Sequence, residues 1–299
     1  MTRVAVVDLG SNSTRLLVAD VDGDGVTELE RRSIVTRLGQ GVERTGRLDP
    51  EAMERVYAAL AEYRRAADEL GAQEIVGVLT SAVRDASNGA EFTDAVRERF
   101  GVAARTVPGE EEARLTYRGA TSGRSTSAPT AVIDIGGGST ELIVGAGARP
   151  DFHVSTQVGV VRHSERHLHA DPPAPGQLRA LREDAAQTFA EAVREAPRAQ
   201  QGVAVAGTAT QSASILQADT LERGALEALL ERLASVPLEQ RRNTPGLDPA
   251  RAPTIVAGVA ILLEATAALG LESVAVSEQD ILIGVALEHS AFRLSHPQF

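Results

Sequence analysis

Two similar turns, one in each half of the chain, constrain the fold more than any other feature of its 299 residues. The first reads VDLGSNSTRLLV over residues 7–18, and the second reads IDIGGGSTELIV over residues 133–144. In each, apolar runs flank a segment of small residues, which predicts a strand, a tight turn and a second strand. The two segments align without a gap and lie about one domain's length apart. Such a repeat predicts two similar halves, each opening with a hairpin.

The residues of both turns suit a phosphate group beside a divalent cation. Glycine lets the backbone approach a ligand and directs successive N–H groups into one concavity, which binds anions. Hydroxyl groups add donors, and an aspartate at the end of the first strand can hold a cation or a water. The alternative is that each turn is an ordinary hairpin turn without a ligand. The presence of two matching copies makes this alternative less favoured. The predicted phosphate-binding residues here are Gly10, Ser11, Asn12, Ser13, Gly136, Gly137, Gly138, Ser139 and Thr140.

The composition excludes several kinds of chemistry. The chain has no cysteine, which excludes thiolate nucleophiles, disulfides and cysteine zinc sites. All 30 basic residues are arginine, and the lack of lysine excludes a Walker-A loop and Schiff-base catalysis. A net charge of −11 with 3% aromatic residues argues against a nucleic-acid partner. Because there is no long apolar run and no signal peptide, we expect a cytoplasmic protein with no membrane partner.

The hydrophobic patterns predict an α/β chain of two domains. In the first half, three strands precede alternating helices and strands, an order typical of a mixed sheet with helices. The small, polar segment 121–129 is the clearest linker, and the second half repeats the plan after it. We therefore predict domains at residues 1–123 and 124–299. The last predicted helix, at 279–290, falls in the second domain, with packing on the first domain as the alternative.

Three further segments carry candidate site residues. Glu110–Glu112 begin a predicted helix. One of them could serve as general base for a water molecule, or all three could simply stabilise the helix N-terminus by interacting with its dipole. Arg84, in a predicted loop after a buried strand, could clamp phosphate or pair with Asp85. Gly207 and Thr208 lie at a predicted strand–helix junction, which forms either an anion site or an ordinary turn.

Several histidines near residue 165 could form a metal site. His163 and His167 share one face of a predicted helix. No acidic residue completes a known zinc spacing such as HExxH, so we interpret these two and His169 as surface residues. Arg162, in the same segment, could clamp phosphate or form a salt bridge.

At this point the motifs resemble those of a known superfamily. Two halves that open with aspartate–glycine phosphate turns resemble the actin, sugar kinase and Hsp70 proteins. Within that superfamily, five ordered segments are similar to the exopolyphosphatase/guanosine pentaphosphate phosphatase (Ppx/GppA) family. They read DLGSNSTRLLV, TSAVRDASN, GEEEARLTYRGA, DIGGGSTEL and GVVRHSERHL, within a match from about residue 4 to residue 288.

The resemblance implies two ribonuclease-H-like domains with a cleft between them, and Mg2+ as the cofactor. The family's catalytic base, the glutamate before the alanine of its EEA motif, falls on Glu112. Its acidic residues fall on Asp8, Asp134 and Glu141, the candidate Mg2+ ligands. The chain departs from the family at Ser277–Gly284, where an arginine is missing, and its length resembles the short, two-domain form.

The function expected on this basis is Mg2+-dependent release of terminal phosphate from inorganic polyphosphate, with short chains favoured. The closest alternative is hydrolysis of pppGpp to ppGpp, so polyphosphate or pppGpp is the expected substrate. Two more distant alternatives are an ATP-dependent kinase of the same superfamily and a non-enzymatic alarmone sensor. A homodimer is the assembly considered.

Overall fold

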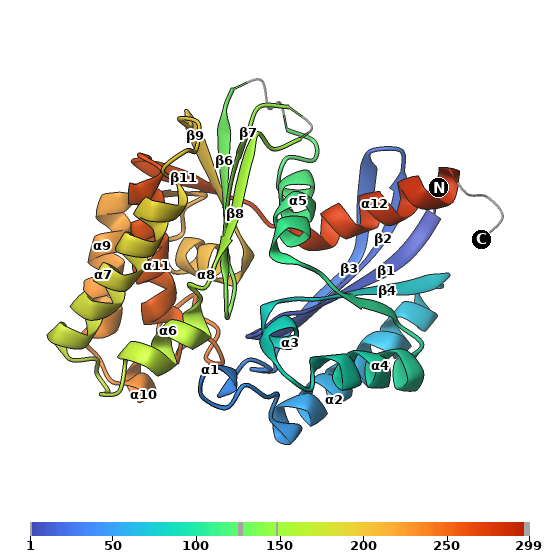
Figure 1. The fold of residues 1–299 in the computed structure, drawn as a ribbon, viewed down its shortest axis with the longest axis horizontal. Helices are drawn as coiled ribbons and strands as arrows, with labels where there is room; N and C mark the ends of the chain where they lie inside the picture. The colour runs from blue at the N-terminus through green and yellow to red at the C-terminus, as the bar shows by residue number, and fades with distance from the viewer. Residues whose placement is uncertain (1, 125–127, 148, 296–299) are drawn as a thin grey trace. The chain divides into compact units, whose positions relative to one another are not determined.

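The computed structural model describes residues 2–124, 128–147 and 149–295, which form two compact units (Figure 1). The first unit comprises the chain up to Arg124 and again from Gln279 onward, and the second comprises the residues between them. The predicted linker at 121–129 spans this boundary, and its residues 125–127 lie outside the described residues.

A five-stranded mixed sheet forms the centre of the first unit, with the strand order β3-β2-β1-β4-β5. The hairpins β1–β2 and β2–β3 are antiparallel, whereas β4 and β5 join in parallel. This order confirms the predicted run of strands followed by alternating helices and strands. The strands are β1 (Thr2–Leu9), β2 (Ser13–Asp22), β3 (Gly25–Val35), β4 (Glu74–Leu79) and β5 (Ala103–Thr106).

Alternate side chains of this sheet enter two separate cores, as the two-residue period of a strand requires. Val7 and Leu9 pack with the helices on one face, while Val4 and Val6 pack with α5 and α12 on the other (Figure 1). The helices of the unit are α1 (Val42–Thr45), α2 (Pro50–Glu69), α3 (Ser81–Asp85), α4 (Gly89–Phe100), α5 (Gly109–Ala120) and α12 (Ile281–Ser295). The short helix α3 occupies part of the loop predicted around Arg84, because Thr80 O accepts from the N–H groups of Val83 and Arg84.

The C-terminal helix α12 belongs to the first unit because it packs tightly on α5. A Cβ on Gly119 would lie 1.8 Å from Asp280 O, and a Cβ on Gly284 would lie 1.9 Å from Leu115 O. Glycine at both positions therefore lets the two backbones approach each other. The predicted second domain, residues 124–299, includes helix α12, and packing of this helix on the first domain was the stated alternative.

The second unit repeats the strand order of the first. Its sheet runs β10-β11-β9-β6-β7-β8, so that β6, β7, β8, β9 and β11 correspond to β1–β5. The extra strand, β10, pairs antiparallel with β11 at the edge. The strands are β6 (Thr130–Ile135), β7 (Thr140–Gly145), β8 (Phe152–Thr156), β9 (Gln201–Val205), β10 (Thr220–Glu222) and β11 (Ser273–Val276).

Helices of the second unit enclose one large core with the sheet (Figure 1). Helix α11 lies at its centre, since its side chains are buried around nearly the whole helix, as its apolar sequence predicts. Helix α7 contributes one stripe, Leu181, Ala185 and Phe189, at four-residue spacing. The helices are α6 (Val160–His167), α7 (Pro175–Ala192), α8 (Ala206–Leu216), α9 (Arg223–Ala234), α10 (Leu238–Arg241) and α11 (Ile255–Ala268).

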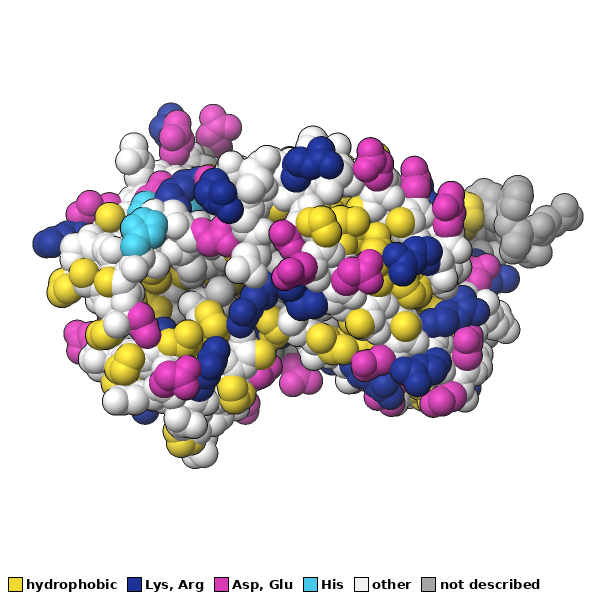
Figure 2. Space-filling view, turned by 90° about the horizontal axis from the view of Figure 1, so that it is seen from below, with side chains coloured by type: hydrophobic (Ala, Val, Ile, Leu, Met, Phe, Trp, Pro, Cys, Tyr) yellow, Lys and Arg dark blue, Asp and Glu magenta, His cyan; other side chains and the backbone are white. Residues whose placement is uncertain are grey.

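The surface carries charges of both signs. On the face shown in Figure 2, arginine side chains are interspersed with aspartate and glutamate. Among the described residues, no helix is long and apolar enough to cross a membrane.

Candidate active site

The two predicted turns have the same backbone geometry. In the first, the Gly10 N–H donates to Ser13 O at 3.0 Å, and in the second the Gly136 N–H donates to Ser139 O at 2.9 Å. Each turn closes an antiparallel hairpin, β1–β2 or β6–β7. The sequence repeat is thus a structural repeat, and both predicted hairpins are confirmed.

The carbonyl groups of the second turn are held by helix α6. The N–H groups of Val160 and Val161 donate to Gly136 O and Gly137 O at 3.0 and 2.8 Å. The Arg162 Nε–H donates to Gly138 O at 2.8 Å. In a trans peptide the carbonyl and the N–H point in opposite directions. The N–H groups that share these three peptide units therefore point away from α6, on residues 137–139.

The segment 36–39 holds the first turn in the same way. The N–H groups of Thr36 and Arg37 donate to Asn12 O at 3.1 and 2.9 Å, and the Gly39 N–H donates to Ser11 O at 2.8 Å. By the same peptide geometry, the N–H groups of Asn12 and Ser13 point away from this segment. Arg37 adopts a positive φ of 51°, a strained conformation for a residue that is not glycine.

Two of the predicted hydroxyl donors are engaged inside the fold. Ser11 Oγ lies 2.9 Å from Ser81 Oγ and accepts from the Ala82 N–H at 3.1 Å. Thr140 Oγ1 donates to Val158 O at 2.6 Å. These hydroxyl groups fix their turns, and the backbone N–H groups remain the main candidates for binding an anion.

The predicted acidic residues differ between the halves. Asp134 and Glu141 are direct partners across the β6–β7 ladder, so their side chains are neighbours on one face. Both are buried, with exposed fractions of 6% and 1%, and Ser155 Oγ donates to Glu141 Oε1 at 2.8 Å. At the equivalent position Asp8 faces Arg15, whose Nη2 lies 2.6 Å from Asp8 Oδ2.

Asp8 belongs to a buried charge network in the first unit. Arg15 also contacts Asp280, which lies 3.7 Å from Arg31 Nη1. Burial raises the pKa of Asp8, an effect that Arg15 opposes and Asp280 reinforces. The second carboxylate oxygen, Asp8 Oδ1, is buried and has no hydrogen-bond partner.

These side chains fit the predicted Mg2+ ion. Mg2+ prefers oxygen ligands, and carboxylates are the usual protein donors. Asp134 and Glu141 place two acids side by side, an arrangement that a divalent cation stabilises. In the first unit, Asp8 Oδ1 and Asn12 Oδ1 are buried oxygens without hydrogen-bond partners. The structure therefore brings together two of the three predicted ligands, and places Asp8 in the other unit with Arg15.

Glu112 is distinguished from its two neighbours by burial. It is 7% exposed in the first turn of α5, and Arg84 Nη1 donates to its Oε2 at 3.1 Å. Glu110 is exposed, and Glu111 pairs with Arg105 at 2.6 Å on the surface. The two predicted site residues, Glu112 and Arg84, thus lie in contact.

The predicted anion site at Gly207 and Thr208 is the first turn of α8, with an arginine packed on it. A Cβ on Gly207 would lie 1.9 Å from Arg251 Nη1, so only glycine admits the guanidinium there. Thr208 is buried and packs against Gly258 of α11. A cation at a helix N-terminus is electrostatically unfavourable unless an anion joins it, and Asp248 Oδ2 lies 3.9 Å from Arg251 Nε. Ala206, with a positive φ of 62°, adds strain at the same turn.

Comparison with known proteins identifies the family. The model of the Ppx/GppA phosphatase family matches residues 17–289. This chain belongs to the Ppx/GppA family. It is 35% identical to Exopolyphosphatase 2 of Mycobacterium tuberculosis, over 96% of this chain and 98% of that one. The predicted family membership is confirmed. The prediction that the protein is an enzyme is confirmed too, because this is a family of phosphatases.

Solved structures of Ppx/GppA proteins confirm the predicted fold class. An exopolyphosphatase-like protein of 33% identity superposes with a TM-score of 0.90, over 98% of this chain and 99% of that one. The Ppx/GppA protein of Aquifex aeolicus, at 26% identity, gives 0.80 and covers 98% of both chains. The predicted α/β fold of two similar halves is thus the fold of these Ppx/GppA structures.

Sequence reasoning missed the residues that support the turns of this Ppx/GppA protein. A Cβ on Gly159 would lie 2.5 Å from Gly137 O, and a Cβ on Gly39 would lie 2.7 Å from Ser11 Cβ. The two glycines occupy equivalent places behind the two turns. Arg251 was missed because it lies 44 residues beyond Gly207 in the sequence and meets it only in the fold. Gly39 and Gly159 each follow the third strand of their half within four residues, which was the available signal.

Replacing Gly159 with alanine should disturb the second turn, because the added Cβ would overlap its backbone. We expect G159A to bind inorganic tripolyphosphate at least about 10-fold more weakly, the scale of one hydrogen bond to a charged ligand. Calorimetric titration in EDTA measures this without hydrolysis. G176A is the matched control, since its Cβ would meet nothing within 4 Å. Wild-type affinity in a folded G159A protein would contradict the role given to this turn.

Proposed function

We propose that this Ppx/GppA protein is an exopolyphosphatase that releases terminal orthophosphate from inorganic polyphosphate with Mg2+. One observation carries the proposal: two turns with the same closing hydrogen bond, each with carbonyls held by the following segment, so that its N–H groups point the other way. A linear chain of phosphates offers anionic oxygens at regular intervals, which repeated N–H turns and arginines suit. The name of the mycobacterial relative, Exopolyphosphatase 2, supports the same choice.

The buried residues have distinct roles in this proposal. Glu112 accepts a proton from a water molecule whose oxygen attacks the terminal phosphorus. The bond from that phosphorus to the bridging oxygen breaks, and the shortened chain leaves. Arg84 and the N–H groups of the turns bind the phosphate oxygens as charge shifts to the leaving group. Asp134 and Glu141 would hold Mg2+, which would supply charge neutralisation, and Asp8 of the first unit is the third predicted ligand.

The aromatic residues favour polyphosphate over pppGpp as substrate. A guanine pocket usually needs an aromatic or apolar slot beside the phosphate site. Five of the aromatic side chains are buried, and Phe100 and Phe152 pack against the cores. Among the described residues, only Phe292, near the C-terminal end of α12, exposes a large part of its ring, 54%. The phosphate turns therefore have no evident aromatic partner for guanine in the part of the chain that the structure describes.

Glu112→Gln should abolish most turnover while preserving the fold. Glutamine keeps the size of the side chain and can still accept from Arg84, but it cannot take the proton. We expect turnover to fall at least about 100-fold, the usual scale for general base catalysis, with little change in KM. E110Q and E111Q are matched controls and should retain activity. Loss in E111Q with full activity in E112Q would show that the base was assigned to the wrong glutamate.

Removal of a proposed Mg2+ ligand should change the response to the metal. We expect E141Q to need at least about 10-fold more Mg2+ for half-maximal phosphate release, because one charged ligand is lost. D24N, in an exposed turn, removes the same charge elsewhere and should leave the Mg2+ response unchanged. Full activity of the wild-type protein in excess EDTA would exclude the metal.

The substrate is tested by comparing short polyphosphate, long polyphosphate, pppGpp and ATP side by side with Mg2+. We expect the highest kcat/KM for short polyphosphate. The net charge of −11 and the acidic groups among the arginines in Figure 2 should repel a long polyanion. Salt screens this repulsion, so the disadvantage of long chains should shrink as ionic strength rises. A higher kcat/KM for pppGpp would overturn the substrate, phosphate transfer from ATP to an acceptor would indicate a kinase, and tight binding without turnover would indicate a sensor.

A further inference from the structure

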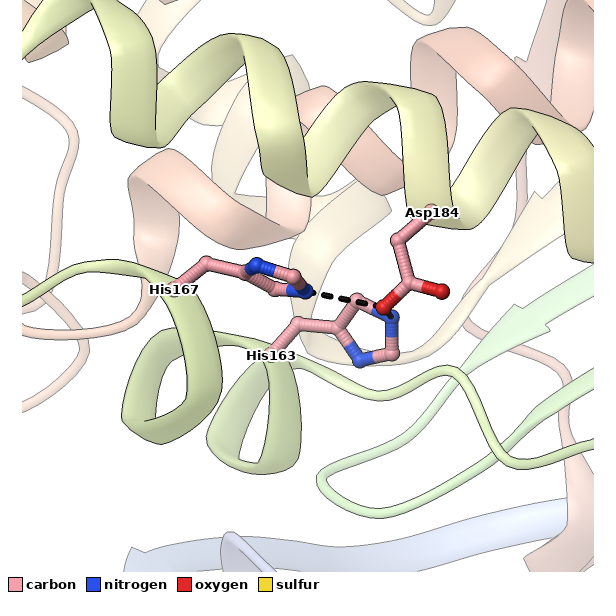
Figure 3. A group of neighbouring side chains, drawn as sticks. All are labelled: His163, His167 and Asp184. Carbon is pink, nitrogen blue, oxygen red and sulfur yellow. Dashed lines mark hydrogen bonds and ion pairs between the residues drawn. The ribbon is translucent and has the colours of Figure 1, made fainter.

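Helices α6 and α7 bring together two histidines and an aspartate that the sequence keeps apart (Figure 3). His163 and His167 lie one turn apart on α6, and Asp184 points toward both from α7. His167 Nε2 lies 2.8 Å from Asp184 Oδ2, and His163 Nε2 lies 3.5 Å from the same oxygen. One ligand atom of each residue lies within 4.8 Å of the other two. Among the described residues, this is the one such group of three that is found.

The interpretation of these histidines as surface residues was wrong for His163, which is only 1% exposed. It failed because the missing acid, Asp184, follows His167 by 17 residues and so completes no recognisable spacing. His169, in contrast, is exposed and lies outside the group.

His163 Nε2 is a buried nitrogen with no hydrogen-bond partner. A buried polar atom without a partner costs free energy, and an apolar side chain of similar size would avoid that cost. The nitrogen is directed toward Asp184, and the rings of His163 and His167 lie side by side with their centroids 5.5 Å apart. Burial also lowers the pKa of His163 to about 4, so that its imidazole is neutral, the form that binds metals.

We propose that His163, His167 and Asp184 form a binding site for a zinc-class transition-metal ion. Two imidazole nitrogens and one carboxylate oxygen are a donor set that zinc and cobalt accept and that Mg2+ does not favour. Histidines four residues apart on one helix can reach the same ion, because their side chains lie on one face. Three protein ligands leave one position of a tetrahedral ion for water.

Three contacts must change when the ion binds. The hydrogen bond between His167 Nε2 and Asp184 Oδ2 must open, because both atoms become ligands. Arg166 Nη1 lies 3.1 Å from Asp184 Oδ2 and competes for the carboxylate, but its side chain is 38% exposed and can turn into solvent. The Gly159 N–H donates to His163 Nδ1 at 3.4 Å. Coordination through Nε2 places the ring proton on Nδ1 and breaks this contact, which is longer than an ordinary hydrogen bond. Removal of Arg166 should therefore strengthen metal binding.

The proposed site shares helix α6 with the second phosphate turn. Val160 and Val161, at the start of α6, donate to the carbonyls of that turn, and His163 follows them by less than one helical turn. An ion that joins α6 to α7 would thereby restrain the segment that holds the turn. The site is distinct from Asp134 and Glu141, and metal binding there can be measured without substrate.

Cobalt binding to the protein without a polyhistidine tag tests the proposal. Co2+ is titrated in excess Mg2+ into wild type, D184N, H167N, R166Q and H169N, and visible absorption reports four-coordinate Co2+. We expect the bands in wild type and in the control H169N, and at least about 10-fold weaker binding in D184N and H167N. R166Q should bind about two- to fivefold more tightly, the scale of releasing one exposed ion pair.

Thermal unfolding with Zn2+ provides a second reading on the same proteins. Because an ion that binds only the folded state stabilises it, Zn2+ should raise the Tm of wild type and H169N but not of D184N or H167N. Equal Co2+ spectra in wild type, D184N and H167N would overturn the proposal, as would loss of the bands in H169N or weaker binding in R166Q. Failure of polyphosphate hydrolysis would leave these readings intact, since none of them uses substrate.

Discussion

The backbone of each turn depends on hydrogen bonds from the segment that follows its hairpin. Without them, the carbonyls of a glycine-rich turn would be free to rotate, and an anion would have to order the turn as it bound. The hydrogen bonds from Val160 and Val161, and those from Thr36 and Gly39, order the turns when the protein folds, so the ligand need not do so. The N–H groups are then directed away from those segments before a ligand arrives, which is the preorganisation that phosphate chemistry requires.

The two turns share this backbone arrangement, but the side chain that faces the aspartate is basic in the first unit and acidic in the second. In the first unit, Arg15 neutralises Asp8, and Asp280 joins the pair from the start of α12. In the second, Glu141 stands where Arg15 would be, so that two acids are neighbours across the ladder. The exchange of one residue in the repeat leaves a structural ion network on one side and the candidate cation site on the other.

The sequence predicted those parts of the molecule that local patterns determine. The two hairpins follow from apolar spacing and turn residues, and they occur as predicted. Glu112 was selected through the family resemblance, and its burial against Arg84 is an observation that composition could not supply. Its catalytic role, like that of the metal ligands, stays a prediction.

Contacts between distant segments were beyond sequence reasoning. The placement of α12 depends on Gly119 and Gly284, which are unremarkable until two helices cross at those positions. Arg251 on Gly207 and Asp184 beside His167 are of the same kind, because each pair joins different elements. A search for fixed spacings finds ligands on one helix, and it fails when the third ligand comes from another.

Helix α6 connects the phosphate turn with the histidine group, and its short length explains why it can do both. The eight residues of α6 place its first N–H groups on the turn and its last turn against α7. So short a helix has little stability of its own and depends on what it packs against. Its position, and with it the orientation of the glycine carbonyls, is therefore set by the two ends together. Asp184 therefore influences the turn at Gly136–Gly138 through helix α6, which contacts both.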